Sequence, residues 1–372
     1  MKILLIGEYS NLHATLAEGL RKLGHQVVVI SDGDCYFDYK RDISLSRKGT
    51  GKWAAIKYVA KLLFYLPRLR GFDIVQLINP DCFAIKAERQ FAIYRYLRRH
   101  NKAVVLGSFG TDWQWVECGM NRKIFRYGDF NIGEKPRQEA HVKQMADEWL
   151  ESSKGKLSRY IANDCDGIVT CLYEYQMCYQ SDYPEKITFI PLPIKTKKTK
   201  PADIERSAPY PIRFFLGIKR EMMHLKGTDI FYDALQKINQ TYSDKCEITV
   251  VENLPFEEYE KKMNGQDVIL DQAYSYTPAM NALQAMSKGI VCVGGGEPEN
   301  YDIIGETELR PIINILPDRE NVFQALEDLI LHPERLSQLK RQSIEYVQKH
   351  HDYIKVAQQY VEFYEKVIIR HH

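Results

Sequence analysis

The sequence has few cysteines, no long apolar run and almost no excess of charge of either sign. It holds eight cysteines in 372 residues, and none of them form a Cys-x-x-Cys pair. That number is too small for a disulfide scaffold, so we expect reduced, buried thiols rather than a zinc site. No apolar run approaches the ~20 residues that cross a bilayer. With 51 Lys and Arg against 49 Asp and Glu, the net charge is +2, which excludes nucleic-acid binding through overall charge.

The N-terminus also lacks the features of a signal peptide. Met1-Lys2 leads directly into a four-residue apolar run, which is too short for a signal peptide and is followed by no small-residue cleavage site. We therefore expect a cytoplasmic protein that meets a membrane only at its surface. No cluster of His, Cys and Asp has the spacing of metal ligands, so neither a metal nor a cofactor is expected.

What the sequence does contain is short apolar runs that alternate with helical patterns. Lys2–Ile6 and Val27–Ile30 suit strands that are buried on both faces, and the leucines between them recur at helical spacing up to Gly24. The same alternation predicts further strands at 74–78, 103–106, 167–171, 187–190, 212–217, 247–251, 268–270, 290–293 and 312–315. This order indicates an α/β protein built on parallel sheets. After Gly7 two of the three glycines of the dinucleotide fingerprint are missing, which argues against NAD or FAD.

A polar, basic stretch divides these strands into two series. Residues 195–201 hold four lysines and have no apolar period. We predict a Rossmann-like domain over 1–194, a linker over 195–201 and a second Rossmann-like domain over 202–349. Ligands of such folds bind at the carboxyl ends of the strands.

Four features of the second half arrive in the order of a known enzyme family. They are Gly217-Ile-Lys219-Arg220 with Lys226-Gly227 behind it, the stretch 279–291, the glycines and acids of 294–300, and a long closing helix. The chain resembles the retaining GT-B glycosyltransferases of family 4, which use sugar nucleotides. The resemblance implies two Rossmann-like domains that face each other across a cleft. It also implies that the first domain binds the acceptor, that the second binds the nucleotide sugar, and that residues 350–372 pack back onto the first domain.

The resemblance gives the basic loop after Gly217 a chemical role. A nucleotide sugar loses a diphosphate, and fixed cations stabilise the charge that develops on this leaving group without a metal. By resemblance Arg220 and Lys226 are these cations, and Lys219 is a substitute for Arg220. The alternative is a solvated basic loop in front of a helix.

The chain departs from the family at both acids of its Glu-x₇-Glu pattern. These acids fall on Tyr276 and Gln284. Gln284 can still hydrogen-bond a ribose hydroxyl, whereas Tyr276 cannot carry the charge of a glutamate at neutral pH. Glu297 and Glu299 are candidates for a displaced carboxylate, or they belong to an ordinary polar loop. The departures keep open a non-catalytic binding or partner subunit, and a sugar-nucleotide epimerase shares the same architecture.

In the first half, Gly110-Thr111-Asp112 follows a predicted strand and resembles the substrate loop of the family, with Phe109 in place of its histidine. Asp112 is the predicted catalytic acid for an acceptor or donor-sugar hydroxyl, and the alternative is that it caps the helix that starts at Trp113. Gly7, again by resemblance, lets the chain pass close to the substrate. Its alternative role is a tight turn.

Residues 43–72 contain seven basic residues and no acid. A helix over part of 52–70 would carry one apolar face, made of Ile56, Val59, Leu63 and Leu66, with Lys57 and Lys61 on the opposite face. A basic amphipathic helix of this kind can lie on an anionic membrane surface. The alternative is a helix that packs this apolar face on the sheet. By resemblance, the acceptor is a lipid-linked glycan or a surface polysaccharide, made at the inner face of the cytoplasmic membrane.

Overall fold

The computed structural model describes residues 1–34, 38–47, 49–196 and 210–370, and it divides the chain into two compact units. The first unit comprises Met1–Ile124, Ala140–Pro193 and Tyr353–His372. The second comprises Phe125–Glu139 and Ile194–Asp352. Most of the predicted linker, from residue 197 onward, lies outside the described residues.

A parallel sheet forms the centre of the first unit. Its strands, within the described residues, lie in the order β3-β2-β1-β4-β5-β8-β9 and run parallel throughout. Four of them are almost completely buried, as their continuous apolar runs predict. The strands are β1 (Lys2–Ile6), β2 (Gln26–Ser31), β3 (Ile43–Ser44), β4 (Ile74–Leu77), β5 (Ala103–Ser108), β8 (Gly167–Thr170) and β9 (Ile187–Phe189).

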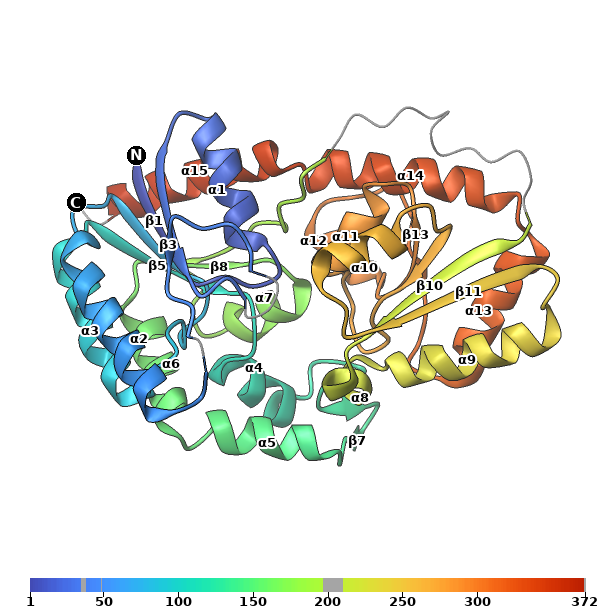
Figure 1. The fold of residues 1–372 in the computed structure, drawn as a ribbon, viewed down its shortest axis with the longest axis horizontal. Coiled ribbons are helices and arrows are strands. Elements are labelled where there is room, and N and C mark those ends of the chain that lie inside the picture. Colours follow the sequence, from blue (N-terminus) through green and yellow to red (C-terminus); the bar gives the residue numbers. More distant parts are fainter. Residues whose placement is uncertain (35–37, 48, 197–209, 371–372) are drawn as a thin grey trace. The chain divides into compact units, whose positions relative to one another are not determined.

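Helices flank this sheet, and the closing helix of the chain is one of them (Figure 1). The helices are α1 (Leu12–Lys22), α2 (Lys52–Tyr65), α3 (Ala87–His100), α4 (Trp113–Glu117), α5 (Ala140–Trp149), α6 (Ser153–Asp164), α7 (Tyr173–Gln180) and α15 (Tyr353–Arg370). A Cβ added to Gly19 would lie 2.5 Å from the carbonyl oxygen of Tyr353, so α1 and α15 pack closely. The Tyr364 hydroxyl donates to Gln76 Oε1 of β4 at 2.7 Å. These contacts fasten α15 to the first unit.

The second unit is built on the same plan. Its sheet, within the described residues, has the order β11-β10-β12-β13-β14 with every pair parallel. The strands are β10 (Ile212–Ile218), β11 (Cys246–Glu252), β12 (Val268–Leu270), β13 (Val291–Gly294) and β14 (Ile313–Asn314). The helices are α8 (Met223–Lys226), α9 (Thr228–Thr241), α10 (Phe256–Met263), α11 (Met280–Met286), α12 (Pro298–Ile303), α13 (Arg319–Leu331) and α14 (Arg335–His350). Buried side chains of β10, α9 and α13 form much of its core.

One segment lies in a different unit from the one that the sequence predicted. Residues 125–139, which we call the strap, fall inside the predicted first domain but belong to the second unit. The strap contains a small antiparallel hairpin, β6 (Asn131–Ile132) with β7 (Lys135–Pro136). Arg137 is buried, and its guanidinium lies 3.8 Å from the centre of the Tyr274 ring and donates to the carbonyl oxygen of His224 at 2.6 Å. These contacts explain why the strap packs with the second sheet rather than with its neighbours in sequence.

Candidate functional site

Most of the predicted nucleotide-sugar residues gather at one edge of the second sheet. Its strands are parallel, so the loops that follow β10, β12 and β13 emerge at the same, carboxyl edge. Lys219, Arg220 and Lys226 follow β10. Tyr276 follows β12, and Glu297 and Glu299 follow β13. This is the edge at which open α/β sheets bind their ligands.

The charge of Lys226 acts on a buried carboxylate, Asp271, that was not predicted from the sequence. Asp271 directly follows β12, is buried and accepts a hydrogen bond from Asn281 Nδ2 at 3.2 Å. Burial raises the pKa of Asp271, and the positive charge of Lys226 opposes that rise. The carbonyl oxygen of Lys226 also accepts from the Ala273 amide at 2.9 Å. A carboxylate immediately after the predicted strand 268–270 was the signal available in the sequence.

The turn after Lys226 requires glycine. Gly227 has φ +68°, and a Cβ there would approach the Ala273 Cβ to 2.7 Å. This left-handed residue ends α8 and begins α9, a helix of 14 residues. Lys226 therefore directly precedes Gly227, the N-cap of a long helix, whose N-terminus favours anions.

Arg220 is exposed, and its Nε donates to Glu252 Oε2 at 2.5 Å. An exposed ion pair of this kind contributes about 0–1 kcal/mol, so Glu252 does not prevent the guanidinium from binding a phosphate. Lys219 is partly buried. At Gly217 a Cβ would lie 2.5 Å from the Tyr259 ring, which explains the glycine by packing.

Tyr276 and Glu297 are buried and receive hydrogen bonds from the strap. The Tyr276 hydroxyl accepts from the Arg126 amide at 2.6 Å. The Glu297 carboxylate accepts from the Tyr127 hydroxyl at 2.6 Å, from Arg126 Nη2 at 2.9 Å and from Asn314 Nδ2 at 3.0 Å. Two of these three donors come from the strap, so the Glu297 carboxylate holds the strap against the second sheet.

Glu299 is paired with the same arginine. Arg126 Nη2 lies 3.1 Å from Glu299 Oε2, and Nη1 contacts the other oxygen. This hydrogen-bonded pairing lowers the pKa of Glu299. The Arg126 guanidinium also lies 4.9 Å from the centre of the Tyr276 ring. Arg126 and Tyr127 were not predicted from the sequence, because their partners lie 150 to 173 residues away along the chain and no local pattern marks them.

Gln284, the other replaced acid, lies on α11. Its Nε2 donates to Glu260 Oε1 of α10 at 3.2 Å, and Lys288 Nζ donates to the same oxygen at 2.7 Å. In the structure the Gln284 amide therefore joins two helices, and its contact with a ribose stays a prediction.

The predicted acceptor loops lie at the carboxyl edge of the first sheet. Gly7 directly follows β1 with φ +87°, and a Cβ there would lie 2.2 Å from Ile78 Cγ2. At Gly110 a Cβ would lie 3.0 Å from the Tyr9 ring. Asn79 Nδ2 donates to the carbonyl oxygen of Thr111 at 3.1 Å, which joins the loop after β5 to the loop after β4.

Asp112 is buried and caps α4. Its carboxylate accepts from the Trp115 amide at 2.9 Å, from the Tyr179 hydroxyl at 2.6 Å and from Ser108 Oγ at 3.3 Å. Burial raises its pKa to about 6, and the three donors oppose the rise. The structure thus shows the helix cap that the sequence offered as the alternative role, and contact between Asp112 and a substrate stays a prediction.

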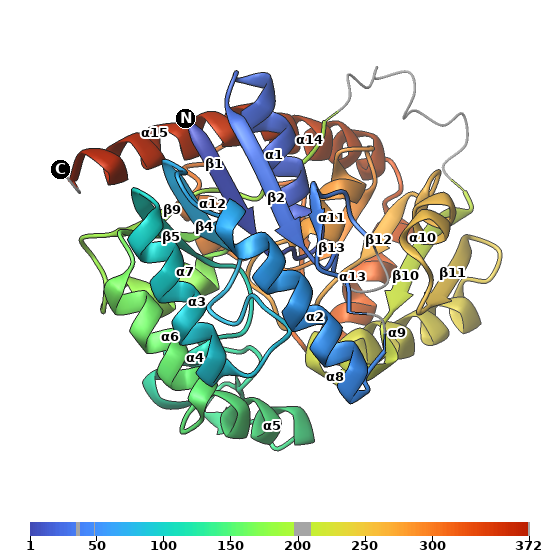
Figure 2. The ribbon, with the colours of Figure 1, turned by 60° about the vertical axis from the view of Figure 1, so that its left-hand side comes forward.

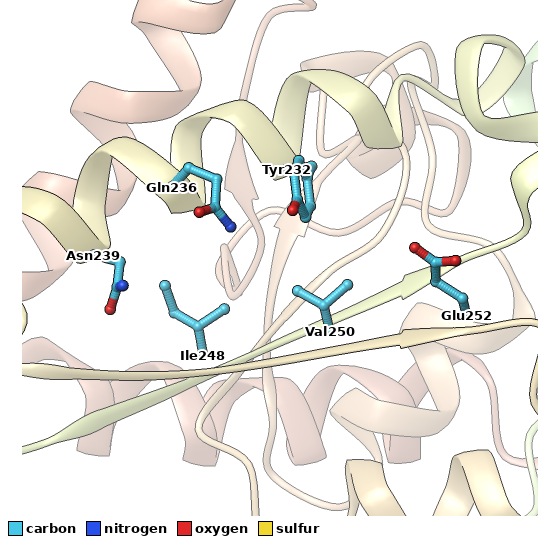
Figure 3. Close-up of a pocket in the computed structure, with 6 residues that line it drawn as sticks. All are labelled: Tyr232, Gln236, Asn239, Ile248, Val250 and Glu252. Atoms are coloured by element: carbon cyan, nitrogen blue, oxygen red, sulfur yellow. The ribbon is translucent and has the colours of Figure 1, made fainter.

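A hollow of about 440 Å³ follows the flank of the second sheet (Figure 3). It is lined by Tyr232, Gln236 and Asn239 of α9 and by Ile248, Val250 and Glu252 of the edge strand β11. Only Glu252, the partner of Arg220, connects this hollow to the predicted nucleotide-sugar residues.

Within the described residues, no group of three or more His, Cys, Asp and Glu side chains is arranged to hold a metal ion. No helix in that part of the chain has the length and apolar character needed to cross a membrane.

The fold is that of the GT-B glycosyltransferases. Sucrose-phosphate synthase from Thermosynechococcus elongatus is similar with a TM-score of 0.62 and 12% identity, over 100% of both chains. Anabaena HepE in complex with UDP and glucose is similar with a TM-score of 0.62 and 12% identity, over 97% of this chain and 98% of that one. The catalytic domain of starch synthase IV from Arabidopsis thaliana, bound to ADP and acarbose, has a TM-score of 0.62 and 11% identity over 100% of both chains.

These structures confirm the predicted architecture of two Rossmann-like domains. No protein-family model matches the sequence, and no curated protein matches it. The likeness is therefore one of fold, found at an identity at which the residues of the site must be argued individually.

Proposed function

We propose that the chain is a glycosyltransferase that moves a sugar from a nucleotide diphosphate sugar to an acceptor hydroxyl. The observation that carries this proposal is the position of Lys226, which directly precedes Gly227, the N-cap of α9, and whose charge acts on buried Asp271. A cation and a helix N-terminus at the carboxyl edge of a sheet suit a diphosphate. Among proteins with this fold, HepE is found with UDP and glucose, and starch synthase IV is found with ADP.

Lys226 and Arg220 supply the charge that the chemistry needs. As the bond between the anomeric carbon and the diphosphate breaks, negative charge grows on the leaving phosphate, and the two cations stabilise it. The acceptor oxygen forms the new bond on the same face of the sugar, and its proton passes to the departing phosphate oxygen. The reaction therefore retains the anomeric configuration and needs no metal. Asp112 holds the Gly110–Asp112 loop in place for the acceptor.

The acceptor in this proposal is a lipid-linked glycan or a growing surface polysaccharide. Such an acceptor is met in the cytoplasm, at the inner face of the cytoplasmic membrane. The basic residues of 52–70 support this location, since they favour an anionic surface.

Titration calorimetry of the full chain with UDP, GDP, ADP and CMP, in the presence of a chelator, tests the donor site. We expect one nucleoside diphosphate to bind, and Lys226→Ala to weaken it by tenfold or more, since a hydrogen bond to a charged group contributes about 1.5–3 kcal/mol. Lys262→Ala, which removes an exposed lysine from α10 of the same unit, is the matched control. If no nucleotide binds, or if Lys226→Ala binds as tightly as the wild type, the assignment fails.

One observation favours the non-catalytic alternative. Glu297 and Glu299 are both engaged by Arg126, and the two family acids are replaced by Tyr276 and Gln284. A binding or partner subunit would bind the nucleotide sugar without turnover of a broad panel of acceptors. An epimerase would instead exchange hydrogen on the donor sugar in heavy water with no acceptor present.

A further inference from the structure

Helix α2 has two apolar faces, and only one of them packs against the first unit. Tyr58 and Leu62 are 4% and 1% exposed, and the Tyr58 hydroxyl accepts from the Ala84 amide at 3.0 Å. On the rest of the helix four large apolar side chains face solvent: Trp53 at 77% exposure, Ile56 at 56%, Leu63 at 57% and Phe64 at 62%. Figure 2 turns α2 toward the viewer.

These four side chains form one stripe. At about 100° per residue, they fall within an arc of about 100° that lies opposite Tyr58 and Leu62. Isolated exposed apolar residues are normal on a protein surface, but four on one face of a 14-residue helix form a patch. No other segment of the described chain covers them.

The stripe corrects the face predicted from the sequence. The expected apolar face included Ile56 and Leu63, and packing of that face on the sheet was the alternative to a membrane contact. In the structure these two residues are exposed, and the buried side of the helix is formed instead by Tyr58 and Leu62. The predicted alternative is therefore wrong for Ile56 and Leu63.

Basic residues border the stripe on one side. By the same helical angles Lys57 and Lys61 follow directly after Phe64 around the helix. The Arg68 guanidinium lies 4.7 Å from the centre of the Phe64 ring. Since residues 43–72 contain no acid, this border is cationic along its whole length.

We propose that α2 binds the surface of an anionic lipid bilayer. Trp53, Ile56, Leu63 and Phe64 enter the boundary between headgroups and acyl chains, and Lys57 and Lys61 extend to the lipid phosphates. The helix lies in the plane of the membrane, because 14 residues are too few to span it. The cationic border argues for a lipid surface, since negative charge is the one property that such a surface presents along the entire helix. This binding does not require transferase activity.

Co-sedimentation of the full chain with vesicles tests the proposal. Vesicles of phosphatidylcholine with phosphatidylglycerol are compared with vesicles of phosphatidylcholine alone, at low and high salt. We expect about tenfold or stronger binding to the anionic vesicles, weakened by salt. Leu63→Gln with Phe64→Gln should weaken that binding by about tenfold or more, because apolar area drives insertion. Lys57→Gln with Lys61→Gln should weaken it about tenfold and reduce its salt dependence.

The control pairs remove similarly exposed residues elsewhere. Leu331→Gln with Ile369→Gln matches the apolar pair, and Lys261→Gln with Lys262→Gln matches the lysine pair. Circular dichroism melts verify that each variant is folded. Equal binding to both kinds of vesicle, no binding to either, or full binding by the Leu63/Phe64 variant would overturn the proposal. A concentration-dependent dimer that the same variant abolishes would also overturn it, because a second copy would then be the occupant of the stripe.

Discussion

Buried carboxylates at the carboxyl edges of the two sheets are satisfied in two different ways. In the first unit, two of the three donors to Asp112 lie within four residues of it along the chain, and none of the three is a cation. In the second unit, Glu297 accepts hydrogen bonds from Arg126 and Tyr127, which lie 171 and 170 residues away, respectively. The first arrangement is made by a loop and the helix that follows it. The second is made only when the strap has packed against the second sheet.

The pKa values of Asp112 and Glu299 are shifted in opposite directions. Without a cation, burial dominates and raises the pKa of Asp112 to about 6. Glu299, which shares Arg126 with Glu297, has its pKa lowered by that guanidinium. The Asp112 carboxylate therefore disfavours the folded state once it ionises, whereas the Glu299 carboxylate favours the folded state when it is charged.

Removing the Asp112 carboxylate should produce the largest effect. Asp112→Ala leaves the Tyr179 hydroxyl, Ser108 Oγ and the Trp115 amide without their acceptor, and we expect a loss of about 4 kcal/mol from the first unit. Tryptophan fluorescence during urea unfolding measures this loss, because all four tryptophans, at positions 53, 113, 115 and 149, lie in the first unit. Asp112→Asn keeps an acceptor for the Trp115 amide and serves as the control. A loss below about 1 kcal/mol in the alanine variant would contradict the cap.

The pH dependence of the same site should be the next largest effect. The folded pKa of Asp112 is about 6 against an ordinary value of 3.8, so between these values only the unfolded chain has released the proton. The free energy of unfolding therefore falls as the pH rises through this window, by about 3 kcal/mol once the pH is above both pKa values. Asp112→Asn has no proton to lose, so its stability relative to the wild type should rise by about that amount between pH 4 and pH 7. A difference between the two proteins that stays constant with pH would show that Asp112 is not desolvated.

The contrast also explains which features could be predicted from the sequence. Buried parallel strands are continuous apolar runs, and the bounds of β1 and β12 were predicted to the residue. The cap at Asp112 was among the predicted roles because an acid before a helix is a local signal. Asp271 carried a similar signal, directly after a predicted strand.

Features that depend on tertiary contacts were not predictable in the same way. Which side of α2 is buried depends on tertiary packing, so periodicity alone could not decide whether Ile56 and Leu63 pack inside the first unit or face solvent, and they face solvent. The strap was assigned to the first domain because its neighbours in sequence belong to that domain. No local sequence pattern marks Arg126 as the partner of Glu297 and Glu299. Tyr276 and Glu297, which were predicted to bind the nucleotide sugar, accept hydrogen bonds from the strap in the structure.

The smallest of the three expected effects tests the hydrogen bond between Tyr127 of the strap and Glu297. Tyr127→Phe removes only the hydroxyl that donates to Glu297 Oε1, while the ring contact with Tyr276 remains. A hydrogen bond to a charged group contributes about 1.5–3 kcal/mol, so the strap should open about thirtyfold more often. Hydrogen exchange of the amides of 125–139 measures this opening, and Tyr160→Phe in the first unit is the control. The tryptophan transition of the first unit should stay where it is. If the exchange of the strap is unchanged, Glu297 does not anchor it, and the carboxylates of the second edge become available to a donor sugar, as the sequence first indicated.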